Sequence, residues 1–393
     1  SAVETWFAKT MYALDEIAAD VAAFRAAVET GASYRPLYVK MKVIWGCNLR
    51  CLGCNHWRDT RPATLAPDRW QVIIDELASL GCRKIHLSGG EPTLRPDLEK
   101  LIARIASHGM RPTLTTNATL INRDRARTLA AAGLRGANVS LDSPDPRVHD
   151  RMRGVDGAWK RTFKGVTYLR RRLKHGHLRI NAVISRLNYT SLAELPDLAA
   201  DLGADHLTLI PLDENTADVR RLNKAQILYY NTRIAPRIAE RALALGLMQS
   251  VNHAYSFGST ADEIELTKVG NYARGQYAIH PCYAPWTHAL IDHTGTVNGC
   301  CVLRTAPIMG DLSAQTFSQV WTGPNYSALH LDRRRPLFEG CRRCDDFLDK
   351  NRALYELLQL TSANTSPMSL SESSIAAIAV KVARSASVNV RAT

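Results

Sequence analysis

The 393-residue sequence has no long apolar run. No uninterrupted apolar segment approaches the roughly 20 residues that a helix needs to cross a bilayer, and no basic, apolar, small-residue signal opens the chain. We therefore expect a soluble, cytoplasmic protein without a membrane span. Acidic side chains are also in the minority, with 37 Asp and Glu against 50 Lys and Arg, which gives a formal net charge of +13.

Aromatic residues are missing from the clusters that carry this charge. The arginine runs at 170–172, 333–335 and 342–343 lack the interleaved aromatic side chains on which nucleic-acid bases stack. We expect them to be solvated faces of amphipathic helices. The charge permits an acidic partner, but a nucleic-acid partner is not expected.

Cysteine, in contrast, is plentiful. Nine cysteines in a protein of the reducing cytosol favour metal ligation over disulfides. Three of them, Cys47, Cys51 and Cys54, fall within eight residues and follow the apolar run 37–45, so a strand is predicted to lead into a metal-binding loop. Closely spaced thiolates suit a cubane iron–sulfur cluster, and three ligands leave one iron open. A structural zinc site formed with His56 is the alternative.

Strand and helix patterns alternate along the first half of the chain. Alternation of this kind predicts a parallel sheet with right-handed crossovers, in which functional sites form at the carboxyl ends of the strands. The cysteine loop lies at such an end. The expected strands are 37–45, 84–88, 112–116, 137–141, 178–184 and 205–210, and the helices between them are 68–80, 98–105, 123–132, 159–173 and 191–202.

The remaining segments predict a helix within 4–30, a long helix over roughly 217–246, an irregular stretch 248–281 and a helix over 345–360. Together these patterns divide the chain into five parts. They are an N-terminal helix (1–36), an α/β barrel (37–216), a helix and linker or cover (217–281), a cysteine-bearing unit (282–360) and a weakly ordered tail (361–393).

The segment Ser88-Gly89-Gly90-Glu91-Pro92 lies at the end of the second strand. Its glycines let the charged end of a ligand approach the backbone, and Glu91 can accept hydrogen bonds from an ammonium group. With the three-cysteine loop one strand earlier, it resembles the radical S-adenosylmethionine (SAM) enzymes, whose open iron is chelated by the amino and carboxylate groups of SAM. The resemblance covers roughly 37–211. It implies a partial (β/α)6 TIM-like barrel in which Gly89, Gly90 and Glu91 hold the SAM amino group.

The resemblance also implies further contacts to SAM. Thr116 and Asn117 end the third strand, and Ser140 and Asp142 end the fourth; they look like the family's contacts to the ribose and carboxylate of SAM. Arg153 resembles the arginine that pairs with the SAM carboxylate. For Asp142 the alternative is a residue that only shapes a turn.

One position departs from the family pattern. Many members have an aromatic residue just before the third cysteine, where it touches adenine, but this chain has Gly53. His56 or Trp57 is the candidate to stack on adenine in its place.

A second cysteine group follows the barrel. Cys282, Cys300, Cys341 and Cys344 surround a predicted hairpin near 290–297, and four thiolates make a closed site. A zinc ribbon is the alternative. Behind a radical SAM barrel, the group resembles the SPASM/twitch extension and implies one auxiliary [4Fe-4S] cluster, because the cysteines suffice only for the single-cluster twitch form.

Four further residues have open roles. Cys82 is expected to be a buried small hydrophobe. Cys301, next to a predicted ligand, is a packing residue, a substitute ligand or a donor of a hydrogen atom to a substrate radical. Asp213 and Glu214 follow the sixth strand as a candidate acid or base, or as solvated loop charges.

The resemblance thus implies a radical SAM enzyme that cleaves SAM reductively to a 5′-deoxyadenosyl radical and abstracts hydrogen from a small-molecule natural-product substrate. Dehydrogenation and epimerisation are both open outcomes, and an electron donor such as flavodoxin or ferredoxin is expected. Peptide maturation that forms a cross-link or an epimer is the alternative. A non-catalytic zinc-ribbon protein that binds nucleic acid is a third reading.

Overall fold

The structure is a computed structural model that describes residues 14–58, 63–174, 176–213, 220–302 and 307–362. The predictions for residues 4–13, for Glu214 and for most of the tail after residue 361 fall outside these ranges. No described helix combines the length and the apolar character needed to cross a membrane.

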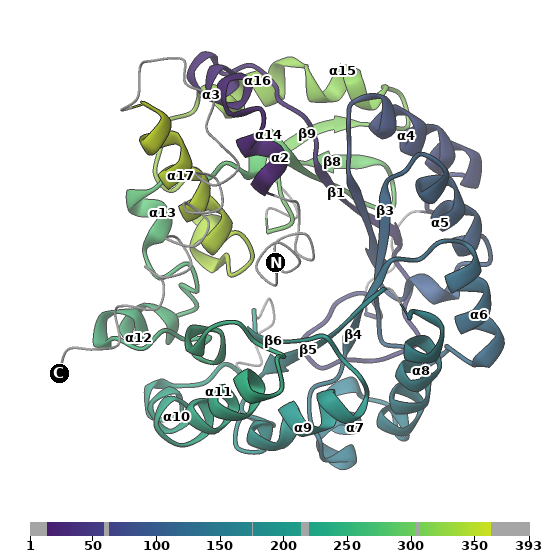
Figure 1. Cartoon of the computed structure of the whole chain (residues 1–393), viewed down its shortest axis with the longest axis vertical. Helices are drawn as coiled ribbons and strands as arrows, with labels where there is room; N and C mark the ends of the chain where they lie inside the picture. The colour runs from purple at the N-terminus through teal and green to yellow at the C-terminus, as the bar shows by residue number, and fades with distance from the viewer. Residues whose placement is uncertain (1–13, 59–62, 175, 214–219, 303–306, 363–393) are drawn as a thin grey trace.

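Six parallel strands form the wall of an open barrel (Figure 1). Neighbours along the chain are neighbours in the sheet, as the predicted right-handed α/β series requires. The expected fold class is therefore confirmed, with boundaries shifted by one or two residues. The strands are β1 (Tyr38–Ile44), β2 (Lys84–Gly89), β3 (Arg111–Thr116), β4 (Gly136–Ser140), β5 (His177–Ile184) and β6 (His206–Pro211).

Helices cover the outer face of this wall (Figure 1). Strand β5 shows why: Leu178, Ile180 and Ala182 are buried in the main core, whereas the residues between them are partly exposed toward the other face. A large-to-small change such as Ile180→Ala would cost about 2–5 kcal/mol. The helices are α4 (Pro67–Ser79), α5 (Leu98–Ser107), α6 (Arg123–Ala131), α8 (Ala158–Arg172) and α9 (Leu195–Asp201), with short 3-10 turns at Pro92–Leu94 and Leu192–Glu194.

Helix α7 (Pro146–Arg153) was not predicted. The Asp145 carboxylate caps its start by accepting a hydrogen bond from the Arg147 N–H at 2.9 Å, and Gly154 ends it in the left-handed conformation. Only His149 and Met152 of this helix are buried, so the segment lacks the long apolar stripe that marks its neighbours in the sequence.

The cysteine-bearing unit continues the barrel sheet. Strand β7 (His288–Ile291) lies parallel to β1, and the antiparallel strands β8 (Thr296–Asn298) and β9 (Ile308–Asp311) follow it, so the predicted hairpin is confirmed. One nine-stranded sheet therefore spans the predicted boundary at residue 282. The short helices of this unit are α14 (Ala284–Thr287), α15 (Phe317–Trp321), α16 (Pro324–Leu331) and the 3-10 turn Glu339–Arg343.

Several predicted helices are divided. In the described part of 4–30, two helices, α2 (Leu14–Ala18) and α3 (Val21–Thr30), replace the single one. The long helix becomes α10 (Lys224–Tyr229), a π turn (Tyr230–Ile234) and α11 (Ala235–Ala244). The stretch 248–281 is less irregular than expected, because it contains a 3-10 turn (Val251–Ala254), α12 (Ala261–Thr267) and α13 (Gln276–Ile279).

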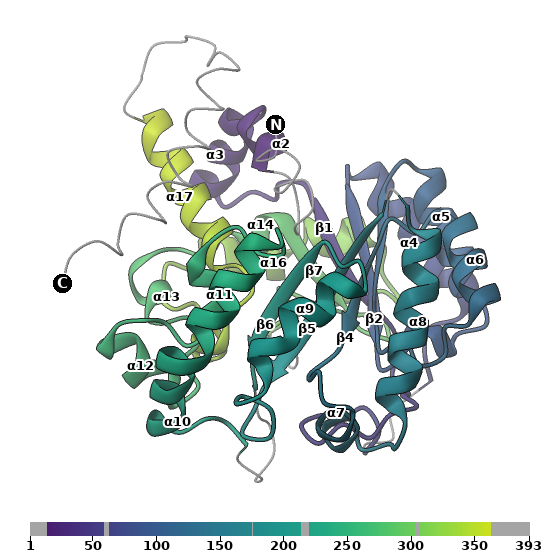
Figure 2. The same cartoon turned by 60° about the horizontal axis from the view of Figure 1, so that its bottom comes forward.

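The two ends of the barrel carry different elements (Figure 2). Helix α3 packs with α17 (Leu348–Ser362) at one end, around Phe24, Trp286 and Leu354. Helix α7 lies at the other end, beside the carboxyl ends of the strands.

Candidate active site

The three-cysteine loop follows β1 and rests on the end of α7. The Arg50 N–H donates to the Arg153 carbonyl at 3.0 Å, and the Leu52 N–H donates to the Met152 carbonyl at 3.1 Å. Gly154 makes this approach possible, since a Cβ at that position would lie 2.3 Å from the Arg50 carbonyl oxygen. The backbone of the loop is therefore held by a helix that lies about a hundred residues later in the sequence.

The thiols of the loop share one partly buried neighbourhood. Burial raises the pKa of Cys47 to about 11, and the charges of Cys51, Glu91 and Cys54 add to the rise. Burial also raises the pKa of Cys51, and the Cys54 charge contributes. A metal centre bound here would supply the positive charge that converts such thiols into the thiolates that ligate it.

The arrangement differs from that of a single-ion site. Among the described residues, no three His, Cys, Asp or Glu side chains converge on a point where one metal ion could bind. A cubane cluster spreads its thiolates over separate iron atoms and does not need that convergence.

Gly89 and Gly90 bring the end of β2 against the cysteine loop. A Cβ on Gly89 would lie 2.1 Å from the Ile44 carbonyl oxygen, and one on Gly90 would lie 2.1 Å from the Gly46 carbonyl oxygen. The N–H groups of Gly90 and Glu91 donate to those same two carbonyls at 2.9 Å. The sequence suggested that the two glycines let a ligand approach the backbone closely. In the structure, the backbone of residues 44–46 also approaches them closely.

Glu91 is buried and joins the ends of β2 and β3. Its Oε1 accepts hydrogen bonds from the Thr93 hydroxyl at 2.6 Å, the Thr93 N–H at 3.1 Å and the Thr116 hydroxyl at 2.7 Å. Its Oε2 accepts from the Asn117 N–H at 2.7 Å. Burial raises the pKa of Glu91, while these donors favour the carboxylate. Glu91 therefore fixes the geometry of the predicted SAM residues around it.

A side-chain network that was not predicted links the cysteine loop to β3. The Asn117 amide donates to Asn48 Oδ1 at 2.9 Å, and the Asn48 amide donates to the Thr119 hydroxyl at 2.8 Å. Thr119 in turn donates to Asn117 Oδ1 at 2.7 Å. The only sequence signal for Asn48 was its place between Cys47 and Cys51.

Asp142, predicted to be among the contacts to the ribose and carboxylate of SAM or to shape a turn, pairs with Arg153, which was expected to bind the SAM carboxylate. Arg153 Nη2 lies 2.7 Å from Asp142 Oδ2, and Arg153 Nη1 donates to Cys51 Sγ at 3.7 Å. The Val183 N–H donates to Asp142 Oδ1 at 3.0 Å. Ser140, at the end of β4, is partly exposed. These contacts place a buried guanidinium beside a cysteine of the loop.

The two candidates for an adenine contact have other neighbours. His56 stacks on Trp45 with ring centroids 4.2 Å apart, and its Nδ1 lies 3.3 Å from Cys54 Sγ. Trp57 donates from Nε1 to the Cys51 carbonyl at 2.9 Å. At Gly53 itself, a Cβ would lie 3.0 Å from Leu212 Cδ1, just beyond β6. One face of His56 is therefore already covered.

The second cysteine group lies in a small core beside α17. Tyr277 and Phe347 share this core with Cys341 and Cys344, and Cys282 packs against it. Burial raises the pKa of Cys282, as do Cys344 and Cys341. The pKa of Cys344 is raised by burial and also by Cys300. The four predicted ligands are thus neighbours: Cys341 and Cys344 are buried and Cys282 and Cys300 are partly buried, and such a set of thiols fits a closed cluster site.

Two side chains contact this group: Asn351 donates from Nδ2 to Cys282 Sγ at 3.5 Å, and the Tyr277 hydroxyl lies 3.8 Å from Cys344 Sγ. Sequence patterns gave no signal for either residue. Cys82, in contrast, is buried in the main core as predicted.

The two candidate catalytic residues face the same unit. The Cys301 thiol donates to Asp346 Oδ2 at 3.2 Å, and burial together with the Asp346 charge raises its pKa well above the usual value. Asp213 lies just beyond β6, and its Oδ1 is 3.7 Å from Nη1 of Arg343. Arg343 stands between Cys341 and Cys344 in the sequence. Asp213 therefore connects the barrel to the second cysteine group.

Two family models match the chain. Residues 41–221 match the radical SAM superfamily, and residues 282–345 match the SPASM iron–sulfur cluster-binding domain. The chain is 38% identical to an Fe-coproporphyrin III synthase of Methanosarcina barkeri, in a match that covers 78% of this chain and 80% of that protein. A PqqA peptide cyclase of Methylocella silvestris is 27% identical over 76% of this chain and 77% of its own length.

Other relatives match over a shorter segment. An AdoMet-dependent heme synthase of Methanosarcina barkeri is 35% identical over 43% of this chain, and the match spans about half of that relative, 48% of its length. Among solved structures, Streptococcus suis SuiB bound to S-adenosylmethionine has the same fold, with a TM-score of 0.60 and 20% identity over 81% of this chain and 74% of SuiB.

Proposed function

The chain belongs to the radical SAM superfamily and carries a SPASM domain, and on that premise we propose that it abstracts a hydrogen atom from a small-molecule substrate held in the barrel. The two domains imply SAM, a [4Fe-4S] cluster and auxiliary iron–sulfur chemistry. When bound, the reduced cluster and SAM supply a 5′-deoxyadenosyl radical as the hydrogen-abstracting agent.

We assign the SAM cluster to the thiols of Cys47, Cys51 and Cys54. The observation that carries this assignment is the anchoring of their loop from three directions. The backbone of residues 89–91 holds one side, the Asn48–Asn117 hydrogen bond holds the second, and the end of α7 holds the third. Anchoring of this kind keeps the loop in one geometry, as a reactive site requires.

We assign SAM binding to the residues around this loop. In this proposal Gly89, Gly90 and Glu91 receive the amino group, Thr116, Asn117 and Ser140 the ribose, and Asp142 and Arg153 order the carboxylate. The buried Arg153 guanidinium suits that role, because it is a charge-assisted donor that is held in place by Asp142.

We assign one auxiliary cluster to Cys282, Cys300, Cys341 and Cys344. Two outcomes remain for a substrate radical formed in the barrel. Transfer of the hydrogen atom of the Cys301 thiol to the opposite face of the radical would give an epimer. Loss of one electron and one proton would give a dehydrogenated product, with Asp213 as a candidate proton acceptor.

The small-molecule assignment is supported by the 38% identity with the Fe-coproporphyrin III synthase over most of both chains. Peptide maturation is the second candidate, because the PqqA peptide cyclase of Methylocella silvestris also matches over about three quarters of the chain (76%).

One experiment separates the two substrate classes. Reduced enzyme is incubated anaerobically with SAM and an extract of the source organism, and 5′-deoxyadenosine is measured above the rate without extract. A small-molecule substrate predicts stimulation that survives complete protease digestion of the extract. Stimulation that disappears after digestion contradicts the small-molecule assignment and favours a peptide.

A further inference from the structure

The inner face of the barrel wall is basic. The six barrel strands carry five cationic side chains and no Asp or Glu. Helices cover the outer face of the wall in Figure 1, and strand alternation places the cations on the opposite face. They are Lys40 and Lys42 on β1, Lys84 on β2, Arg111 on β3 and Arg179 on β5. The strands therefore bring positive charge, and no negative charge of their own, to the inside of the barrel.

Lys40 and Arg179 lie within their strands and have no counter-ion in direct contact. The residues on either side of each belong to the buried main core: Val39, Met41, Leu178 and Ile180. Both cations are partly exposed at the inner face. Within the described ranges, neither side chain forms a hydrogen bond or an ion pair.

The acidic groups that face these two cations come from the cysteine-bearing unit. Asp346 attracts Arg179, and Lys40 acts on Asp345, but both pairs are beyond ion-pair distance. Asp346 already accepts the hydrogen of the Cys301 thiol at 3.2 Å. Burial lowers the pKa of Arg179 in spite of the attraction by Asp346, so the guanidinium charge is incompletely compensated.

Other groups on the inner face respond to the same positive charge. Burial lowers the pKa of Lys84 well below its usual value, and the charge of Arg179 adds to the fall. Burial also lowers the pKa of His86, and the charges of Lys40, Lys84 and Arg179 contribute. Lys40 and Arg179 thus act on one and the same imidazole, which places them in one neighbourhood. A buried region in which cations repel one another is stabilised by a bound anion.

Lys40 connects this neighbourhood to Cys301, the proposed hydrogen-atom donor. The Lys40 charge opposes the rise in the pKa of the Cys301 thiol, so the ammonium group lies near that sulfur. Lys40 also lies on β1, whose carboxyl end leads into the three-cysteine loop. A ligand group held by Lys40 would therefore lie inside the barrel and close to the proposed donor.

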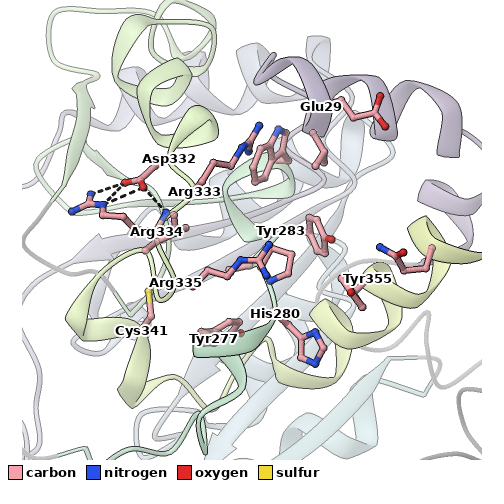
Figure 3. A pocket seen from close by; sticks show the side chains of 16 residues that line it. Glu29, Tyr277, His280, Tyr283, Asp332, Arg333, Arg334, Arg335, Cys341 and Tyr355 are labelled. Carbon is pink, nitrogen blue, oxygen red and sulfur yellow. Dashed lines mark hydrogen bonds and ion pairs between the residues drawn. The ribbon is translucent and has the colours of Figure 1, made fainter. Parts of the chain in front are cut away.

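A different group of arginines shows how this chain neutralises a guanidinium. Arg333, Arg334 and Arg335 lie beyond α16 rather than on the predicted helix face, and they line a cavity of about 300 Å³ (Figure 3). Figure 3 shows Arg334 turned toward Asp332, and its Nη2 lies 2.5 Å from Asp332 Oδ2. Arg334 thus has a carboxylate partner although it is exposed, whereas Arg179 has none among the described residues.

We propose that Arg179 and Lys40 form an anion site inside the barrel, and that the substrate carries a carboxylate or phosphate group that binds there. The inference rests on the proposed function and deepens it, because it names the chemical class of the molecule from which hydrogen is abstracted. The planar guanidinium of Arg179 offers paired N–H donors that match two oxygens of such a group, and Lys40 adds a point charge.

The first test sorts the substrate by charge. Extract that stimulates 5′-deoxyadenosine formation by reduced wild-type enzyme is passed at neutral pH over an anion-exchange resin, with an uncharged resin as the control. The stimulating compound should be retained by the anion exchanger and should elute with salt. Stimulation that stays in the anion-exchange flow-through would overturn the anionic class.

The second test assigns the charge to the site. In Arg179→Gln, the amount of salt eluate that gives half-maximal stimulation should rise about tenfold with little change in the maximal rate, because a contact to bound substrate is lost. Arg179→Lys should recover part of this loss, and Lys40→Gln should shift in the same direction. Arg172→Gln, an exposed change on α8, is the matched control and should behave as the wild type. An unchanged half-maximal amount in Arg179→Gln would reject the site.

A binding measurement that does not depend on turnover uses inorganic phosphate as the probe. Phosphate should raise the thermal midpoint of the anaerobic wild-type holoenzyme more than that of Lys40→Gln/Arg179→Gln. Sodium chloride at equal ionic strength corrects for screening. Equal rises in both proteins would contradict the site. If the Arg179 variants lose their iron, Lys40→Gln alone carries this comparison.

Failure of the anion site and failure of the proposed function give different results. Iron content and the slow formation of 5′-deoxyadenosine without extract should be the same in Arg179→Gln and in the wild type, because the site binds substrate and not SAM. If no fraction of the extract stimulates the wild type, the proposed hydrogen abstraction fails, and the anion site fails with it. If the wild type is stimulated by the flow-through, the proposed function stands and the anion site alone is rejected.

Discussion

Arg153 and Asp142 form a buried ion pair of 2.7 Å, and the same guanidinium donates to the sulfur of Cys51 at 3.7 Å. This relationship joins the end of α7 and the segment after β4 to the cysteine loop. A buried pair of this kind is costly to break, because the partner that remains keeps an uncompensated charge.

The first prediction concerns that pair. Asp142→Ala should lower the free energy of unfolding by about 3–5 kcal/mol, because it leaves the Arg153 charge buried alone. The double variant Asp142→Ala/Arg153→Met should recover part of the loss. Arg151→Met, an exposed change on the same helix, should stay within about 0.5 kcal/mol of the wild type. Anaerobic urea unfolding measures all three, and an unchanged midpoint for Asp142→Ala would contradict the role of the pair.

A second prediction uses the glycines between β2 and the cysteine loop. In Gly90→Ala the new Cβ would meet the carbonyl oxygens of Gly46 and Trp45 at 2.1 and 2.2 Å, so the loop must move. We expect the free energy of unfolding to fall by about 1–3 kcal/mol. We also expect the variant to lose the iron that the loop holds. Gly46→Ala is the matched control, since nothing lies within 4 Å of its Cβ. Equal iron contents in both variants would refute the argument.

The third prediction concerns pH and Lys350 in α17. Burial lowers the pKa of Lys350 to about 7, whereas a lysine in the unfolded chain keeps its proton to about 10.4. Between these values the unfolded state binds more protons, so stability should rise with pH by up to about 1.4 kcal/mol per pH unit.

Its test compares urea midpoints at neutral and mildly alkaline pH. Lys350→Met should flatten the rise, and the exposed Lys100→Met should leave it intact. If Lys350→Met retains the full slope, another group is responsible for it.

The fourth prediction separates the two fates of the substrate radical. In Cys301→Ala, an epimerase should lose turnover to the epimer while it still forms 5′-deoxyadenosine, because the proposed hydrogen-atom donor is absent. A dehydrogenase should be little affected. Product analysis in deuterated water adds a second readout, since a thiol donor that has exchanged with solvent places deuterium on the product.

Local patterns were sufficient for much of the barrel. The strand and helix periods gave the six parallel strands, and the cysteine spacings with Gly89-Gly90-Glu91 gave the family. Contacts made by distant segments left no such pattern. Asn48 meets Asn117 only because β1 and β3 end at the same edge, and Gly90 is constrained by the carbonyl of Gly46.

In the cysteine-bearing unit, too, local sequence patterns do not predict the contacts between distant segments. The pairing of β7 with β1 unites segments about 250 residues apart, and no local periodicity encodes it. The local charge of the arginines at 333–335 predicts a solvated helix face, whereas the partners that distinguish Arg334 from its neighbours are set by the turn after α16.

The most direct test of the central claim is the iron content of anaerobically prepared protein together with its products on reduction with SAM. Two cubane clusters predict brown protein with about eight irons, loss of about half of them in the Cys47/Cys51/Cys54→Ala variant, and 5′-deoxyadenosine from the wild type only. Colourless protein that contains zinc and no iron, and that leaves SAM intact, would contradict the account.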